Sequence, residues 1–297
     1  MNAPGTPPVV GIIGGSGLYE IDGLTGAAWQ PVATPWGAPS DEILTGYVDD
    51  QKCCFLPRHG RGHPLSPSDL NSRANIDAFK RLGVTEVISL SACGSLTETL
   101  PPGTFVIVDQ FIDRTHGRAR SFFGPGMVAH VGLGHPVCRR LGDAIEEAAN
   151  TIGVPVVRGG TYVVIEGPQF STLAESNLYR AWGCDVIGMT NMPEARLARE
   201  AELCYATVAM VTDYDCWHPD HDHVSVEAII RVLKDNAEKA RELVKRLVPL
   251  LKQREGACPE GCHTALGQAL ITAPFARDPA LVAKLDAVAG RVLPREP

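Results

Sequence analysis

The sequence predicts an α/β fold in which a largely parallel β-sheet is flanked by helices. Apolar, β-branched runs of strand length alternate along the chain with longer segments of helical periodicity. Such alternation is typical of crossover connections, which make neighbouring strands parallel and bury both faces of the sheet. The chain has 297 residues, 44% of them apolar, which is enough for a large buried core.

Each element is predicted from the composition of its own segment. Strands are expected where Val and Ile dominate, at 9–14, 84–92, 104–111, 161–167, 184–190 and 204–212. Helical patterns lie near 71–82, 136–152, 172–182, 192–203 and 225–252. The composition shifts at residue 253, and a short helical pattern follows it. We therefore expect one domain over residues 8–297, with 253–297 as an appendage packed on its body.

Composition argues against several classes of protein. The formal net charge is -7 and there is no Lys/Arg-rich run, so a nucleic-acid partner is not expected. The start of the chain lacks a secretory pattern and no run of about eighteen apolar residues occurs, which predicts a cytoplasmic protein without a membrane partner. Nine dispersed cysteines, including Cys258-x3-Cys262, predict mostly reduced and buried thiols.

Two segments near the start of the chain carry groups that suit an anion. "GIIGGSGL" fails the dinucleotide fingerprint because Glu20 stands at its third glycine position, but its backbone N–H groups and Ser16 could hold an anion. A tight turn that needs glycine is the alternative. Arg58 and His59 follow the apolar "CCFL", and arginine matches phosphate oxygens, although a solvated loop is equally consistent with this cluster.

Two further strand ends present small residues. "SLSACGSL" ends in Ser91 and Ala92, which allow close approach of a ligand, while Cys93 fits a buried thiol better than a nucleophile. Thr190 precedes a helix whose Asn191 and Glu194 have capping-box spacing, so it should lie beside a helix N-terminus that favours anions. Functional sites in open α/β sheets lie at the carboxyl ends of strands, so we expect one phosphate bound by Ser16, Arg58, His59, Ser91 and Thr190.

The segment 211–224, "VTDYDCWHPDHDHV", raises the question of a metal site. If the chain is still extended there, a period of two places Asp213 and Asp215 on one side, where their charges repel and one carboxyl holds a proton. The other candidate ligands lack regular zinc spacing: Cys216, His218, Asp220, His221, Asp222 and His223. A solvated loop without a metal is therefore expected.

Several motifs together resemble the 5′-methylthioadenosine phosphorylases of the trimeric purine nucleoside phosphorylase family. They are "GIIGGSGL", "RHGRGHPLSPSDLNSRANI", "SACGSL", "DQFIDRTHGRARSFF", "IEGPQFST", "GMTNMPEARLAREAELCYATVAMVTDYDCW" and "VSVEAIIRVLKDNAEKA". The resemblance runs in order from about residue 9 to residue 248. It implies one domain with a mixed, barrel-like sheet flanked by helices, a homotrimer with active sites near subunit interfaces, and cleavage of a nucleoside by inorganic phosphate without metal or organic cofactor.

The resemblance also implies roles for individual residues. Phosphate would be bound by Ser16, Arg58, His59, Ser91, Ala92 and Thr190. Met189 would lie beneath the ribose and Phe170 would face the purine, whose edge would contact Thr212, Asp213 and Asp215. The methylthio pocket would be lined by Val226, Ile229 and Ile230, with His130 contributed by a neighbouring subunit. Two departures are Ser72, where tyrosine is common in the family, and the short glycine-rich loop 124–130.

The predicted reaction is phosphorolysis of S-methyl-5′-thioadenosine to adenine and 5-methylthioribose 1-phosphate. Asp213 is the candidate general acid for N7 of the leaving purine, and Asp215 the acceptor for its amino group. A 6-oxopurine nucleoside or methylthioinosine phosphorylase is the alternative within the fold, but an ionised carboxylate fits a 6-amino group better than a 6-oxo group. A nucleotide- or anion-binding module without catalysis is the alternative from another class.

Overall fold

The computed structural model describes residues 7–15, 18, 22–219, 226–253 and 256–293, with the backbone alone described at 226–230. Its α-helices are α1 (Ser72–Arg81), α2 (Arg139–Thr151), α3 (Leu173–Ala181), α4 (Asn191–Glu200), α5 (Val226–Lys252), α6 (Pro279–Lys284) and α7 (Asp286–Ala289). Each helical segment expected from the sequence is therefore found, with ends displaced by a few residues.

The described strands form one 11-stranded sheet. They are β1 (Val10–Gly14), β2 (Thr25–Gln30), β3 (Ile43–Val48), β4 (Gln51–Pro57), β5 (Glu86–Ser95), β6 (Phe105–Ile107), β7 (Gln110–Arg114), β8 (Val156–Arg158), β9 (Thr161–Ile165), β10 (Val186–Gly188) and β11 (Cys204–Asp213). The main path runs β2-β3-β4-β1-β5-β10-β9-β7, and a branch leaves β5 through β11 and β6 to β8.

The sheet is mixed, which confirms what the family resemblance implies and corrects the largely parallel sheet expected from the alternation of strands and helices. β1, β4, β5 and β11 pair in parallel, whereas β10 runs antiparallel to β5 and β6 antiparallel to β11. The β2-β3-β4 meander is antiparallel and was not predicted. β2 is almost entirely exposed, so it lacks the apolar pattern by which buried strands are recognised. The run predicted at 104–111 divides into β6 and β7, which join different parts of the sheet.

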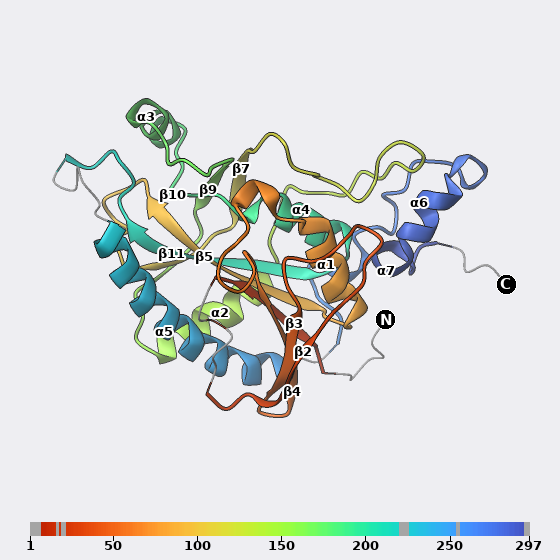
Figure 1. Ribbon diagram of the computed structural model, residues 1–297, viewed down its shortest axis with the longest axis horizontal. Helices are drawn as coiled ribbons and strands as arrows, with labels where there is room; N and C mark the ends of the chain where they lie inside the picture. Colours follow the sequence, from red (N-terminus) through yellow and green to blue (C-terminus); the bar gives the residue numbers. More distant parts are fainter. Residues whose placement is uncertain (1–6, 16–17, 19–21, 220–225, 254–255, 294–297) are drawn as a thin grey trace.

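The central strands are buried on both faces because their side chains alternate between two apolar cores. Along β11, Cys204, Ala206 and Val208 point into the core beneath α2 and α5, while Tyr205 and Ala209 point into the core beneath α1 and α4. Figure 1 shows the helices distributed around the central strands, with α5 running along one side. These covering helices leave the carboxyl ends of β5, β10 and β11 as the places where loops and side chains can form a site.

The chain after α5 returns to the body rather than extending from it. Arg291 forms an ion pair with Glu202, with a nitrogen–oxygen distance of 2.5 Å, and Arg81 of α1 pairs with Asp286 of α7. α7 lies beside α1, and α6 beside α7, at one end of the molecule (Figure 1). Among the described residues, the helices are all too short or too polar to cross a membrane.

Candidate active site

A pocket of about 690 Å³ opens at the carboxyl ends of β1, β5, β10 and β11. This volume is in the range of sites for small organic ligands. Ten of the residues predicted from the sequence line it: Arg58, His59, Ser91, Ala92, Phe170, Met189, Thr190, Thr212, Asp213 and Asp215. Phe170, Met189 and Thr212 were expected here from the family resemblance, and the others from their places after predicted strands.

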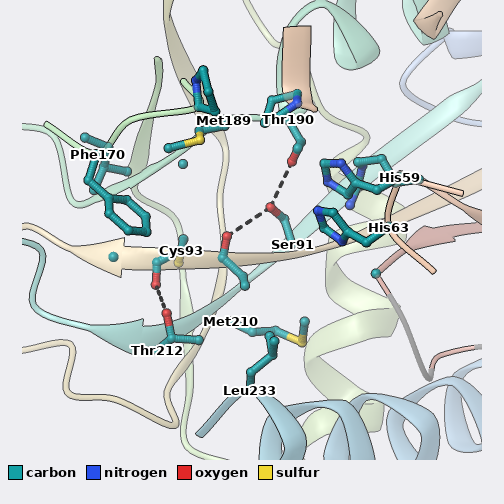
Figure 2. Close-up of a pocket in the computed structure, with 18 of the residues that line it drawn as sticks. His59, His63, Ser91, Cys93, Phe170, Met189, Thr190, Met210, Thr212 and Leu233 are labelled. Carbon is teal, nitrogen blue, oxygen red and sulfur yellow. Dashed lines mark hydrogen bonds between the residues drawn. The ribbon is translucent and has the colours of Figure 1, made fainter. Parts of the chain in front are cut away.

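One end of the pocket is polar. Ser91 Oγ lies 3.1 Å from Thr190 Oγ1 and 3.1 Å from Tyr162 OH, so these hydroxyls form one buried network. Figure 2 shows the His59 and His63 rings beside Ser91 and Thr190. Two hydroxyl groups and two imidazoles around one space provide several donors and acceptors for an oxyanion.

The two imidazoles stack on each other, with ring centroids 4.2 Å apart and an angle of 9° between the planes. His59 Nδ1 lies 2.9 Å from Leu65 O, so the proton of the neutral ring is on Nδ1 and Nε2 is the free acceptor. Burial, and then the positive charge of Arg58, lower the pKa of His59 to about 4. A neutral His59 can accept a proton shared by a bound hydrogen phosphate.

Arg58 lies at the floor of this end, with its side chain 3% exposed. Its Nε donates to Glu194 Oε2 at 3.1 Å, and its Nη groups donate to Ser89 Oγ at 2.6 Å and Leu90 O at 2.9 Å. The charge of Glu194 raises the pKa of Arg58 against the opposing effect of burial. Most donors of this guanidinium are therefore occupied by protein, which restricts its direct contact with a ligand.

The capping box predicted for Asn191 and Glu194 is wrong. Thr190 is the N-cap of α4, without a side-chain cap hydrogen bond. The Asn191 amide instead donates to Ser89 Oγ and to the hydroxyls of Tyr205 and Thr207, and Glu194 pairs with Arg58. Both side chains are almost fully buried, so hydrogen bonds to distant strands replaced the local cap that their spacing suggested.

The backbone that carries Met189 is fixed by an arginine that the sequence reasoning passed over. Arg118 Nη1 donates to Met189 O at 2.6 Å and to Met192 O at 2.8 Å, while Nη2 donates to Glu166 O at 2.7 Å. Its Nε also bonds Glu166 Oε1 at 3.1 Å. Four contacts from one buried guanidinium hold the segment from Met189 to Met192 against the loop after β9.

Asp213 and Asp215 both line the pocket, but they do not reach it as alternate side chains of one extended strand. The β11–β5 register shifts between Val211 and Asp213, so the adjacent Thr212 and Asp213 both reach the pocket. Asp215 follows the strand with φ 52°, in the left-handed region, and turns back to the same space. A bulge and a turn therefore replace the extended chain that was expected up to Asp215.

Hydrogen bonds orient Asp213. Thr212 Oγ1 bonds both Cys93 O at 3.1 Å and Asp213 Oδ2 at 2.6 Å, and the Asp215 backbone N–H donates to Asp213 Oδ1 at 2.8 Å. Burial raises the pKa of Asp213, and burial followed by the charge of Asp213 raises the pKa of Asp215. Raised pKa values make a protonated carboxyl available for proton transfer.

Gly94 permits this arrangement through its missing side chain. A Cβ at Gly94 would lie 3.1 Å from Asp213 Oδ1 and 3.3 Å from the Asp215 Cβ. Contacts this short would force the two aspartates to move, so the glycine near the end of β5 makes room for the acid pair.

The remaining walls are apolar and include residues that were not predicted. Phe170 lies across the pocket from His59, and Met210 and Leu233 form its lower wall in Figure 2. His63 stands in the same basic cluster as Arg58 and His59, although it was not assigned to the phosphate site, and Leu233 gave no recognisable signal because it is one of many leucines on a helix. Phe170 is 73% exposed in the single chain, so little protein covers its outer side.

The other predicted site residues are not part of this wall. His130 is exposed and does not line the pocket of its own chain; its backbone N–H donates to Ala269 O at 2.8 Å. Ser16 lies outside the described residues, as do the side chains of Val226, Ile229 and Ile230. Gly15 and Leu18, on either side of the undescribed Ser16 and Gly17, do line the pocket.

The described part of the 211–224 segment is occupied by aromatic packing. The Tyr214 ring lies with its centroid 4.7 Å from that of His218 and 5.9 Å from that of Trp217. Trp217 Nε1 donates to Ser95 O at 2.8 Å, which fastens the loop to β5. The candidate ligands Asp220, His221, Asp222 and His223 lie outside the described residues.

Comparison with known proteins agrees with this architecture. Residues 9–249 match the model of the phosphorylase superfamily. The S-methyl-5′-thioadenosine phosphorylase of Rhodospirillum rubrum is 65% identical over 286 residues, covering 96% of this chain and 97% of the relative.

Two solved structures have a similar fold as well as a similar sequence. A methylthioadenosine phosphorylase from an antarctic soil metagenomic library superposes with a TM-score of 0.90 at 46% identity, covering 97% of this chain and 99% of the other. The methylthioadenosine phosphorylase of Schistosoma mansoni in complex with adenine has a TM-score of 0.82 at 37% identity, covering 88% and 98%. The chain belongs to the phosphorylase superfamily and, within it, to the family of S-methyl-5′-thioadenosine phosphorylases.

Proposed function

We propose that this protein catalyses phosphorolysis of S-methyl-5′-thioadenosine, giving adenine and 5-methylthioribose 1-phosphate. The observation that carries the proposal is the pocket with hydroxyls and imidazoles at one end and two buried carboxyls with raised pKa values. Phosphate requires hydrogen-bonding groups such as those at the polar end, and a leaving purine requires a proton donor such as a protonated carboxyl. The activity named for relatives that are 65% identical supports the choice of nucleoside.

Phosphate is assigned to the polar end. Ser91, Thr190 and His59 offer groups that can bind its oxygens, and Ala92 leaves space for close approach. Ser16 and Arg58 complete the set by family resemblance. A phosphate oxygen attacks C1′ of the ribose as the C1′–N9 bond breaks, and the phosphate charge stabilises the positive charge that develops on the sugar.

The acid pair is assigned to the purine. The electrons of the broken bond pass to the purine, and Asp213 protonates N7 as adenine leaves. Asp215 accepts a hydrogen bond from the 6-amino group, and Thr212 orients Asp213 through their 2.6 Å hydrogen bond. A site built for a donor at this position rejects a 6-oxopurine, because the buried carboxylate would face another acceptor.

The sugar and its methylthio group are assigned to the apolar walls. Met189 lies beneath the ribose and Phe170 stacks on the purine; Val226, Ile229 and Ile230 contact the methylthio group. We further propose a homotrimer in which His130 reaches the site of a neighbouring subunit. The exposure of Phe170 and His130 in the single chain supports such an assembly, and light scattering of the purified protein tests it.

The reaction as proposed uses no cofactor, and its partners are the nucleoside and phosphate. Residues 8–297 act as one domain, to which the segment after residue 253 is joined by the ion pairs described above. The free cysteines support a reducing compartment, and we place the enzyme in the cytoplasm.

A substrate panel tests the function. Purified protein is incubated with methylthioadenosine, methylthioinosine, adenosine or inosine, each with and without phosphate, and the free base is measured by chromatography. We expect rapid release of adenine from methylthioadenosine only when phosphate is present. Preferred release of hypoxanthine would instead assign the site to 6-oxopurines, and release without phosphate would identify a hydrolase.

A further inference from the structure

Four buried cysteines bring their sulfur atoms together where α2 and β11 begin, whereas the pocket lies at the carboxyl end of β11. They are Cys138, Cys204, Cys258 and Cys262, and the four Sγ atoms all lie within 4.8 Å of one another. The Sγ atoms of Cys138 and Cys258 are 3.6 Å apart. None of the four residues is more than 3% exposed. The sequence pattern pointed only to the Cys258-x3-Cys262 pair, because the four members are spread over more than a hundred residues.

The spacing of the sulfurs suits a tetrahedral metal. A Zn–S bond of about 2.3 Å places the four sulfurs of a tetrahedral site roughly 3.8 Å apart. The 3.6 Å between Cys138 and Cys258 is close to that edge and far from the covalent distance of a disulfide, about 2.05 Å. The four side chains therefore already converge on one point as metal ligands must.

Local structure holds each ligand in place. Cys138 is the N-cap of α2, where the helix dipole favours a thiolate, and its backbone N–H donates to Tyr205 O at 2.7 Å. Cys204 is the first residue of β11. Cys258 and Cys262 stand on one turn, closed by a 3.0 Å bond from Gly261 N to Cys258 O. Their separation by three residues falls within the usual ligand spacing of structural zinc sites.

Positive charge accompanies the sulfurs. Arg199 is 9% exposed, and its Nη1 lies 3.6 Å from Cys262 Sγ. Arg140, in the first turn of α2, pairs instead with the buried Glu86, with Nη2 2.6 Å from Oε2. An apolar cluster of neutral thiols gains little from a buried guanidinium. Four thiolates around a divalent cation carry a net charge of −2, part of which Arg199 offsets.

We propose that Cys138, Cys204, Cys258 and Cys262 form a structural site for a thiophilic divalent cation, and that its physiological occupant is Zn²⁺. Binding forms four Zn–S bonds, and the protons of the four thiols pass to solvent. The metal joins the segment after α5 to α2 and β11, and so fixes the C-terminal part of the chain on the body. The expectation of a chain without metal considered only the irregular segment 211–224, which is not part of this cluster.

The first experiment measures metal in the intact protein. Protein purified without chelator, and apoprotein reloaded anaerobically with Zn²⁺ after reduction, are analysed by mass spectrometry of the elements. We expect one Zn²⁺ per chain in both. Substitution with Co²⁺ should give the absorption of a tetrahedral cobalt–thiolate centre. Stripping with chelator should lower the Tm by about 5 °C or more and speed proteolysis after residue 253.

Matched variants locate the metal. Cys258→Ser and Cys262→Ser should lose stoichiometric Zn²⁺, whereas Cys184→Ser should keep it, because Cys184 is equally buried but lies outside the cluster. If the cluster variants do not fold, the cobalt spectrum of the wild type decides the question. A wild-type chain that binds no stoichiometric Zn²⁺ after reduction overturns the proposal, whether thiol titration finds nine free thiols or disulfides among the four.

Discussion

Replacing either Arg58 or Glu194 alone should lower the free energy of unfolding by more than half of what is lost when both are replaced together. The two side chains are 3% and 5% exposed, and Nε lies 3.1 Å from Oε2. With an effective dielectric constant of about 20, two unit charges at this separation attract by about 5 kcal/mol. Either single variant, Arg58→Met or Glu194→Gln, leaves one charge buried without its partner, which costs about 3–5 kcal/mol.

The double variant removes both charges together. We expect its loss of unfolding free energy to be smaller than the sum of the single losses by about 2–3 kcal/mol. Urea denaturation followed by circular dichroism measures all four proteins, and Arg61→Met is the control because Arg61 forms ion pairs at the surface. Additivity within about 0.5 kcal/mol would refute the interpretation of a coupled buried pair.

The same proteins test whether Arg58 also binds phosphate. If Arg58 binds phosphate, its loss raises KM for phosphate in Arg58→Met and in the double variant alike, with little change in KM for the nucleoside. We expect this result from the family resemblance. Recovery of the phosphate KM in the double variant would leave Arg58 with a purely structural role.

Three further predictions concern single side chains. Asp213→Asn should lower turnover of methylthioadenosine by about 10²–10⁴-fold because the proton donor is lost, while Asp215→Asn should cost less and favour methylthioinosine; wild-type rates in both would remove them from the site. Burial and then Arg58 lower the pKa of His59 from 6.5 to about 4, so the unfolded chain binds more protons in that window. His59 should therefore reduce stability as pH falls through it, by at most about 3 kcal/mol, and a His59→Gln variant with an unchanged pH profile of urea midpoints would contradict this. Burial raises the pKa of Glu200 from 4.5 to about 7 against its bonds from Ser121 and Phe122, so its contribution is lost as pH rises through that range. Glu200→Gln should raise the Tm relative to wild type at pH 8 and lose this advantage near pH 4; an equal difference at both pH values would contradict it.

Sequence patterns predicted the part of the site that depends on strand ends. The apolar runs before Ser91, Thr190 and Asp213 are long enough to be recognised as buried strands, and the parallel β5 and β11 bring their carboxyl ends to one edge. Convergence of Ser91 and Asp213 on one pocket followed from that rule, whereas Thr190 reaches the pocket from β10, which runs antiparallel to β5. The β-bulge at Thr212 did not, because the pairing with β5 that creates it is not visible along one segment.

Predictions from short-range spacing failed where distant partners competed. Asn191 and Glu194 have the spacing of a capping box, but buried donors and acceptors on other strands bind them instead. β2 escaped detection for a different reason, since an exposed strand needs no continuous apolar run; β3 and β4 are buried but short, and their pairing is not visible along one segment. The cluster of four cysteines could not be predicted from spacing either, because only the folded chain brings Cys138 and Cys204 close to the turn that carries Cys258.

The most direct test of the proposed chemistry follows labelled phosphate into product. Protein is mixed with methylthioadenosine and ³²P-phosphate, and adenine and labelled sugar phosphate are counted in the same reaction. We predict one labelled 5-methylthioribose 1-phosphate for each adenine released, and loss of both products in Asp213→Asn. Adenine that appears without label in the sugar would contradict phosphorolysis and show that water, rather than phosphate, attacks C1′.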